Sequence, residues 1–533
     1  MTTATRSVSR DPRCCILALD QGTTSSRAIL FDRRGVPLAT AQEEFPQIVR
    51  QAVRTDAGEG AGADDGAADA AIVEHDPEAI WQSQLACGRR VLESSGTSPE
   101  QVAAIGITNQ RETTILWDRA TGRPVAPAIV WQSRVSAAIC GRLREQGVEE
   151  EVRRRTGLLL DPYFSATKIM HLFETVTGLR ERCEAGEVLF GTVDSFLVWR
   201  LTGGRVHATD VTNASRTLLF DIHRLEWSDD LCRIFGVPRA MLPDVRPSSG
   251  PFGATDAAWL GASIPITGCA GDQQAAAFGQ GCLRAGDAKT TYGTGAFLMF
   301  ATGQKPVASR HGLLTTPACT LAGAGAAAPP ADYFLEGSVF VAGSLVGWLR
   351  DGLGMIGEAR EIEPLARSVA DSGGVMLVPA LTGLGAPHWD PFARGLLIGL
   401  SRATTRAHVA RAALEAIAFS VADVVACMQR DAGVALGRLR VDGGASGNDL
   451  LMQMQADVLG IPVERPAVIE TTSLGAALLA GLATGFFPDQ AAVAEARRVE
   501  RVFEPRLAAA ARDRLLARWR NAVDRCRDWA RPG

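Results

Sequence analysis

Two short segments, half a chain apart, combine glycine with hydroxyl side chains in a pattern that suits phosphate binding. The first reads DQGTTSSR over residues 20–27 and the second reads TYGTG over residues 291–295. Glycine lets backbone N–H groups approach an anion because no Cβ blocks the way, and the threonine and serine hydroxyls add donors. Neither segment is a Walker P-loop or a GxGxxG fingerprint. Two such loops facing each other would hold a polyphosphate from both sides, whereas an ordinary glycine turn between strands is the simpler alternative.

Two aspartates stand where phosphoryl transfer would need them. That chemistry requires donors for the phosphates, a metal to offset their charge and a base near the acceptor hydroxyl. Asp20 ends an apolar run beside the first loop, where Mg²⁺ would have to separate a carboxylate from phosphates, so it is the candidate metal site. Asp272 follows Gly271 after another apolar run and is the candidate base. The alternatives are that Asp20 caps its turn and that Asp272 caps the following helix.

Four polar residues, 109–112, follow the apolar segment 102–107. Each hydroxyl of a polyhydroxyl ligand wants a donor and an acceptor, so the adjacent Arg111 and Glu112 suit a pocket for such a ligand. A surface ion pair is the alternative. Trp131 and Phe297 could wall the carbon skeleton, although either aromatic alone is more often part of the core. Arg27 could reach phosphate oxygens or remain a solvated charge.

The elements that must position these residues alternate between strands and helices, which predicts an α/β fold. The first half reads as a strand at 15–19, a returning strand at 28–31, a helix opened by Asp76 and Pro77, and a strand at 102–107. The second half shows the same alternation of elements. It reads as a strand at 264–267, the TYGTG hairpin, a strand at 375–380, a helix at 404–430 stopped by Gly433, and a strand at 439–441. The turn DGGASGN at 442–448 could approach a nucleotide base or ribose, or could simply join strand to helix. We therefore expect a duplicated fold around a cleft, with domains at 14–265 and 266–533.

Composition narrows the class of protein. A chain of 533 residues with 46% hydrophobic and 21% charged residues is expected to form two or more globular domains. The net charge of −4 gives no electrostatic case for nucleic acid. Eleven scattered cysteines without CxxC or Cys/His spacing fit reduced thiols in the cytoplasm. No apolar stretch of the kind found in signal peptides precedes the first strand, so we expect no secretory signal. The apolar segment 471–488 is too short to span a membrane and predicts a tightly packed core helix.

Ten motifs, in this order from about residue 14 to residue 530, resemble the FGGY family of carbohydrate kinases: DQGTTSSR, ITNQRETT, IVWQSR, DPYFSATK, GTVDSFLVW, TNASRT, AGDQQAA, TYGTG, LTGLGAPHWDP and VDGGASGN. Within that family, ITNQRETT and DPYF are similar to members that act on glycerol. The resemblance implies two ribonuclease H-like domains of the actin-type ATPase class around an ATP cleft. It also implies ATP and Mg²⁺-dependent phosphorylation of glycerol by a cytoplasmic homodimer or homotetramer, and the alternative is a kinase of another small polyol or ketose.

The resemblance also implies roles for individual residues. The residues matching the nucleotide site are Thr23, Thr24, Ser25 and Arg27 at the phosphates, Thr294 in the opposing loop, and Gly343, Gly444 and Asn448, with Asp20 near Mg²⁺. The residues matching the glycerol site are Arg111, Glu112, Tyr163, Gln273 and the base Asp272, with Trp131 and Phe297 as aromatic walls. An actin-like or chaperone-like ATPase would need an appended protein-binding element, which the sequence does not show. Intact Asp20 and Asp272 argue against a catalytically silent relative.

Some segments depart from the family pattern. Gly347 stands where relatives often have glutamine, which puts one adenine-side contact in doubt. The stretch 257–263 lacks the arginine of a loop that binds fructose bisphosphate in some members, so we expect no bisphosphate site there. The acidic, low-complexity segment 55–71 predicts a flexible surface insertion outside the catalytic site. The Ala/Arg-rich segment 504–523 gives no basis for assigning regulatory partners.

Overall fold

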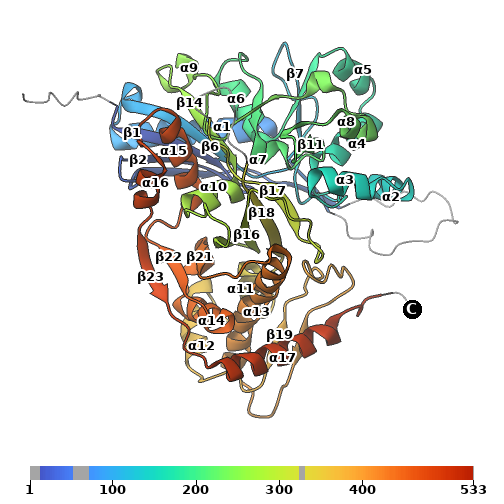
Figure 1. Cartoon of the computed structure of the whole chain (residues 1–533), viewed down its shortest axis with the longest axis vertical. Helices are drawn as coiled ribbons and strands as arrows, with labels where there is room; N and C mark the ends of the chain where they lie inside the picture. The colour runs from blue at the N-terminus through green and yellow to red at the C-terminus, as the bar shows by residue number, and fades with distance from the viewer. Residues whose placement is uncertain (1–12, 52–70, 323–330, 532–533) are drawn as a thin grey trace, which may run out of the picture.

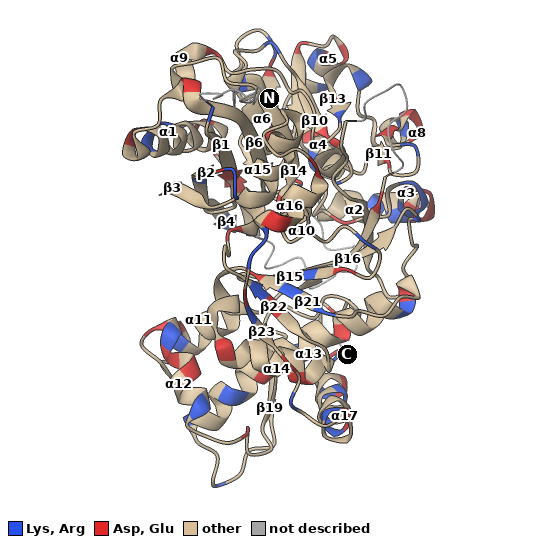
Figure 2. Cartoon of the chain, turned by 60° about the vertical axis from the view of Figure 1, so that its left-hand side comes forward, with Lys and Arg blue, Asp and Glu red and all other residues tan. Residues whose placement is uncertain are grey.

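A computed structural model describes residues 13–51, 71–322 and 331–531, which form two lobes stacked along the long axis of the molecule (Figure 1). Apart from residue 71, the predicted insertion at 55–71 lies outside the described residues. In the view of Figure 2, basic and acidic residues are interspersed over both lobes. Among the described residues, no helix is long and apolar enough to cross a membrane.

The first lobe is built on a five-stranded sheet in the order β14-β6-β1-β2-β3. Its strands are β1 (Cys15–Gln21), β2 (Ser25–Phe31), β3 (Pro37–Glu44), β6 (Val102–Asn109) and β14 (Ile266–Gly271). The predicted hairpin around DQGTTSSR is confirmed, since β1 and β2 pair antiparallel, while β6 and β14 run parallel to β1. Helices α1 (Pro77–Ser95) and α6 (Val193–Leu201) cover one face of this sheet. Asp76 caps α1 and Pro77 opens it, as predicted.

The second lobe contains a seven-stranded sheet in the order β17-β18-β16-β15-β21-β22-β23. Its strands are β15 (Ala288–Tyr292), β16 (Ala296–Gly303), β17 (Leu314–Pro317), β18 (Tyr333–Val339), β21 (Leu439–Asp442), β22 (Val463–Pro466) and β23 (Val499–Phe503). Read from β18 to β22, two antiparallel pairings are followed by two parallel ones, the same sequence as from β3 to β14 in the first sheet. The predicted duplication is therefore confirmed by topology. Helices α13 (Arg406–Ala432) and α14 (Asp449–Leu459) pack on this sheet, and Gly433 ends α13 in the left-handed conformation.

The boundary predicted at residue 265 does not match this topology, because β14, which follows it, pairs with β6 in the first sheet. The chain passes to the second sheet only after α10 (Asp272–Gly279). Conversely, α15 (Thr471–Ala483) belongs to the second half of the sequence but packs on the other face of the first sheet, opposite α1 and α6. Glycine permits this approach, since a Cβ at Gly106 would lie 2.1 Å from the carbonyl oxygen of Ala476. The predicted tightly packed core helix is confirmed by α15.

The remaining elements extend the two lobes. In the first lobe they are β4 (Ile48–Gln51), β5 (Ala71–His75), β7 (Ile115–Asp118), β8 (Ala128–Ile129), α2 (Ala137–Glu145), α3 (Glu149–Thr156), α4 (Ser165–Thr175), α5 (Leu179–Glu184), β9 (Val188–Gly191), β10 (Ala208–Asp210), α7 (Val211–Ala214), β11 (Phe220–Asp221), β12 (Glu226–Trp227), α8 (Asp229–Phe235), β13 (Asp244–Arg246) and α9 (Ala257–Leu260). The later ones are α11 (Gly343–Asp351), α12 (Ile362–Arg367), β19 (Met376–Val378), β20 (Leu396–Ile398), α16 (Gln490–Ala496) and α17 (Ala509–Cys526).

Candidate functional site

The carboxyl ends of the neighbouring parallel strands β6 and β14 bring Arg111 and Asp272 together. Nε of Arg111 lies 3.1 Å from Oδ1 of Asp272. Gly271 makes room for this pair, since a Cβ there would lie 2.6 Å from Cδ of Arg111. Arg111 is almost fully buried, whereas the side chain of Asp272 keeps 33% of its surface exposed. Asp272 is therefore the member of the pair that a ligand can reach.

Glu336, on β18 of the second lobe, binds the other side of Arg111. Its carboxylate accepts hydrogen bonds of 2.7 and 2.8 Å from Nη1 and Nη2 of Arg111, and a third of 3.1 Å from Nη2 of Arg216. Burial raises the pKa of Glu336, but the two guanidinium groups outweigh it and lower the value to about 2. Glu336 was not among the residues predicted from the sequence. Its signal was a single acid in the otherwise apolar strand YFLEGSV, where a charge is seldom buried without a partner.

Glu112 is held in an unusual backbone conformation beside Arg111. Its φ is 63°, in the left-handed region, which costs free energy for a residue with a side chain. Its carbonyl oxygen accepts hydrogen bonds of 3.1 Å from Ser165 and Lys168, and its carboxylate accepts one of 2.6 Å from Nε of Arg216. Burial raises the pKa of Glu112 and lowers that of Lys168 to about 7. Arg216 and Lys168 belong to motifs quoted above, but neither was predicted as a site residue.

The three predicted aromatic residues form one cluster next to the first phosphate loop. The ring of Trp131 lies 5.6 Å from that of Tyr163 and 6.4 Å from that of Phe297, both edge to face. The indole Nε1 of Trp131 donates a 3.0 Å hydrogen bond to Oγ1 of Thr23. All three rings remain partly exposed, so they can contact a ligand. Phe297 comes from the second lobe, and the cluster therefore joins both halves of the chain.

The first loop turns sharply between β1 and β2. The N–H of Gly22 donates to the carbonyl oxygen of Ser25 at 2.9 Å, and Thr24 is exposed at the tip. Arg27, across the hairpin from Asp20, forms an ion pair with Glu470, which immediately precedes α15. Its guanidinium is therefore directed at a carboxylate in this structure.

Asp20 lies at the end of β1 and accepts a 2.7 Å hydrogen bond from Ser473. Burial raises the pKa of its carboxyl to about 6, although Ser473 and Arg27 lower it, and the nearby Glu470 and Asp272 add to the rise. The negative charge of Asp20 is thus incompletely compensated by the protein. A divalent cation would supply the missing positive charge, so this carboxylate fits a metal site.

Gln273 is hydrogen-bonded to a lysine that was not predicted as a site residue. Its amide oxygen accepts a hydrogen bond from Nζ of Lys289 on β15, which also donates to Oγ1 of Thr291 at 2.7 Å. Lys289 is fully buried, and burial lowers its pKa. The second phosphate hairpin is thereby connected to the residue next to the candidate base.

A cavity of about 900 Å³ opens in the second lobe beside the TYGTG turn. The four predicted nucleotide-site residues of this half all line it: Thr294, Gly343, Gly444 and Asn448. Close backbone contacts shape it, since a Cβ at Gly343 would lie 2.5 Å from the carbonyl oxygen of Gly293. Gly347 also lines the cavity, and a Cβ there would meet nothing within 4 Å. The first-loop residues Thr23, Thr24, Ser25 and Arg27 do not line it, so the structure does not bring the two predicted halves of the phosphate site into one cavity.

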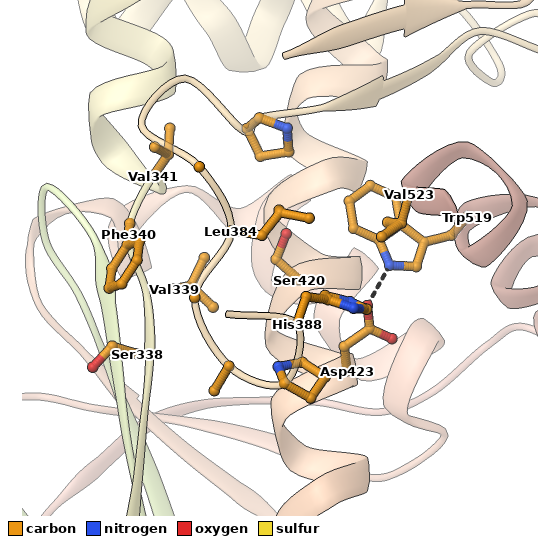
Figure 3. A pocket seen from close by; sticks show the side chains of 15 residues that line it. Ser338, Val339, Phe340, Val341, Leu384, His388, Ser420, Asp423, Trp519 and Val523 are labelled. Carbon is orange, nitrogen blue, oxygen red and sulfur yellow. Dashed lines mark hydrogen bonds and ion pairs between the residues drawn. The ribbon is translucent and has the colours of Figure 1, made fainter. Parts of the chain in front are cut away.

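The LTGLGAPHWDP segment lines a different and much smaller cavity of about 40 Å³, seen in Figure 3. There Oδ2 of Asp423 accepts a 2.6 Å hydrogen bond from Nε1 of Trp519, and Nε2 of His388 lies 4.0 Å from the same oxygen. A cavity of this size holds water but no nucleotide. In the described structure this motif therefore lies beside α13 and α17 and forms part of the wall of that small cavity.

Two segments that depart from the family pattern pack elsewhere. Within 257–263, Trp259 of α9 packs edge to face on Trp81 of α1 at 5.1 Å. Within 504–523, α17 packs on the second lobe through Trp519 and Val523. The absence of a bisphosphate site at 257–263 remains a prediction.

The family is established by comparison with known proteins. Residues 15–279 match the N-terminal domain, and residues 288–484 the C-terminal domain, of the FGGY family of carbohydrate kinases. The chain belongs to this family of two-lobed, actin-type kinases.

Its relatives are similar over nearly their full length. The chain is 55% identical over 515 residues to glycerol kinase of Dechloromonas aromatica (97% of this chain, 98% of the relative) and 55% identical over 520 residues to glycerol kinase of Thermus brockianus (97% and 99%). A crystal structure of Plasmodium falciparum glycerol kinase with ADP superposes with a TM-score of 0.85 at 33% identity (96% and 98%). A xylulose kinase from Rhodospirillum rubrum shares the fold, with a TM-score of 0.79 at 24% identity (95% and 98%).

Proposed function

We propose that this chain phosphorylates glycerol at a terminal hydroxyl at the expense of ATP. The observation that carries the proposal is the half-open carboxylate of Asp272 beside the buried guanidinium of Arg111, at the junction of two lobes that belong to a kinase family. The relatives named glycerol kinase, at 55% identity, support glycerol over another polyol or a ketose as the acceptor.

In this proposal glycerol lies among Trp131, Tyr163 and Phe297, with its hydroxyls bound by Arg111, Glu112 and Gln273. The terminal oxygen attacks the γ-phosphorus of ATP as its proton passes to a carboxylate oxygen of Asp272. A new O–P bond forms, the bond from the γ-phosphorus to the bridging oxygen breaks, and ADP leaves with that oxygen. Asp272 fits the part of base because it is both reachable and held by a fixed cation.

The nucleotide is proposed to occupy the cavity of about 900 Å³ through Thr294, Gly343, Gly444 and Asn448. Thr23, Thr24, Ser25 and Arg27 would meet its phosphates after the lobes close, which also limits hydrolysis by water. Mg²⁺ near Asp20 would offset the phosphate charge. Arg27 must then exchange Glu470 for phosphate.

We further propose a cytoplasmic homodimer or homotetramer whose partner is its small substrate, without nucleic acid or membrane. All eleven cysteines are free, in keeping with a reducing compartment. Light scattering of the purified protein would report the assembly, and a monomer would contradict that part of the proposal.

A coupled assay of ADP release tests the function. We expect turnover that depends on glycerol and exceeds the rates with erythritol, xylulose or dihydroxyacetone. Equal ADP release with and without glycerol would favour an ATPase instead, and a preference for another acceptor would favour a different kinase of the family.

The variant Asp272→Asn tests the base. The structure places Gly271 at the N-cap of α10 and Asp272 in its first turn, where Oδ1 accepts a hydrogen bond from the N–H of Gln273. The amide oxygen of asparagine can accept the same hydrogen bond, so a role limited to the start of α10 predicts little change. We expect kcat to fall by about 10²- to 10⁴-fold, the usual worth of a general base. The matched control is Asp489→Asn, because Asp489 caps α16 through the N–H of Ala492. Near-normal turnover of a folded Asp272→Asn protein would show that Asp272 is not the base.

A further inference from the structure

Glu336 is a buried acid that nothing in the proposed reaction uses. It is 1% exposed, and its neighbours along β18 include Phe334 and Leu335 of the core. Figure 1 places β18 at the junction of the two lobes. Its carboxylate binds two arginines of the first lobe, Arg111 in a bidentate pair and Arg216 through a single hydrogen bond.

These contacts belong to a chain of alternating charges. Glu112 binds Arg216, Arg216 binds Glu336, Glu336 binds Arg111, and Arg111 faces Asp272. The first four members are at most 3% exposed, and only Asp272 at the end is open. The acid supplied by the second lobe thus stands between the two arginines of the first.

Glu336 also determines which donors of Arg111 remain for a ligand. A guanidinium has five N–H groups. Two point to Glu336, a third donates 3.1 Å to Oε1 of Gln274, and Nε faces Asp272. One N–H of Nη2 has no partner among the described residues, and its direction is fixed by the bidentate pair.

Stability alone does not account for this arrangement. A buried ion network is often no more stabilising than apolar residues of the same volume, because the charges must be removed from water. The bidentate geometry does, however, prevent rotation of the Arg111 guanidinium. We propose that Glu336 is a positioning residue, which orients Arg111 from the opposite lobe so that its free N–H meets a substrate hydroxyl while Nε holds Asp272. This inference rests on the proposed glycerol phosphorylation.

The test is the kinetics of Glu336→Gln, which keeps the shape of the side chain and removes its charge. A displacement of a positioning group by about 1 Å costs on the order of 100-fold in rate, so we expect kcat/KM for glycerol to fall by about that factor. The KM for ATP should stay within about twofold, because the cavity around Thr294 and Asn448 lies outside the charge chain.

The matched control is Glu464→Gln on β22 of the same sheet. Glu464 is 5% exposed and binds Arg438 and Arg497, away from the charge chain. Both variants should lower the melting temperature, but only Glu336→Gln should change the glycerol kinetics. Glu336→Asp provides a milder second variant if Glu336→Gln does not fold, because it keeps the charge but shortens the side chain by one methylene group. It should also lower kcat/KM for glycerol.

Folded Glu336 variants with wild-type kcat/KM for glycerol would overturn the inference. The inference would also be overturned if kcat/KM fell equally for glycerol and for ATP and by the same factors as in Glu464→Gln. Such a result would indicate that Glu336 has a structural role alone. If the wild-type protein itself shows no glycerol-dependent ADP release, the proposed function fails first. The two failures can therefore be distinguished in one set of assays.

Discussion

Replacing Gly271 by alanine should disable glycerol binding while leaving the nucleotide cavity intact. The added Cβ would lie 2.6 Å from Cδ and 2.7 Å from Cγ of Arg111. The backbone at Gly271 has φ −60° and ψ 147°, which alanine adopts freely, so the clash is the main effect. Restoring ordinary contact distances requires the Arg111 side chain to move by about 1 Å.

That displacement sets the expected magnitude. Moving a substrate-positioning group by about 1 Å costs on the order of 100-fold in kcat/KM. Overpacking of the buried site should also lower the free energy of unfolding by about 1–3 kcal/mol. The assay measures initial rates against glycerol at saturating ATP, and against ATP at saturating glycerol. We expect the loss in the first series and little change of the KM for ATP in the second.

Gly268→Ala is the matched control, because the same substitution three residues earlier on β14 clashes with a different partner. A Cβ at Gly268 would lie 2.6 Å from the backbone nitrogen of Ala480 in α15, without contact to Arg111. Both variants should melt at lower temperature than the wild type. An equal fall of kcat/KM for glycerol in both variants would show that the clash with Arg111 is not the cause. A folded Gly271→Ala protein with normal kcat/KM for glycerol would show the same.

Two further predictions concern charge. Glu470→Gln should lower the KM for ATP by about two- to fivefold, the worth of one partly exposed ion pair, because Arg27 would lose its carboxylate partner and keep only its neutral hydrogen bond to Gln42. An unchanged or raised KM for ATP would contradict this. Burial lowers the pKa of His75 from 6.5 to about 4. Between these two pH values the imidazole is protonated in the unfolded chain and neutral in the folded chain. The free energy of unfolding therefore falls as the pH decreases through this range. The free energies of unfolding of the wild type and of His75→Gln, measured by denaturant, should therefore differ by an amount that changes by about 1.4 kcal/mol per pH unit in that range. A difference that does not depend on pH would show that the pKa of His75 is not lowered by folding.

Local signals predicted much of the fold. Asp76 with Pro77, and Gly433, act on their own backbone. The helix α1 begins, and the helix α13 ends, where these residues stand. The two hairpins were equally predictable, because a glycine turn between apolar runs is a local pattern. The boundary at residue 265 failed for the opposite reason. The pairing of β14 with β6 joins segments more than 150 residues apart, and no local feature of 266–271 encodes it.

The candidate site divides in the same way. Arg111 and Asp272 were predictable because Asp272 directly follows an apolar strand and Arg111 comes two residues after the end of another, and neighbouring parallel strands end at one edge of a sheet. Glu336 and Lys289 lie within strands of the second lobe, and their partners are known only once the two sheets face each other. The resemblance to the family identified ligand-contacting positions, whereas the residues that hold those positions required the tertiary structure.

The distribution of partners separates a rigid part of the site from an adaptable one. Arg111 is held by Glu336 and Asp272, and Arg216 by Glu336 and Glu112, so neither guanidinium can rotate without leaving a buried charge unpaired. By contrast, Thr24 and Thr294 at the tips of the phosphate hairpins are exposed, and Arg27 is bound by a partly exposed glutamate, Glu470, and by the exposed side chain of Gln42. The acceptor side is therefore preorganised in this structure, while the phosphate side must still assemble. Glycerol should accordingly bind in the absence of nucleotide, because nothing on its side of the site has to be ordered first.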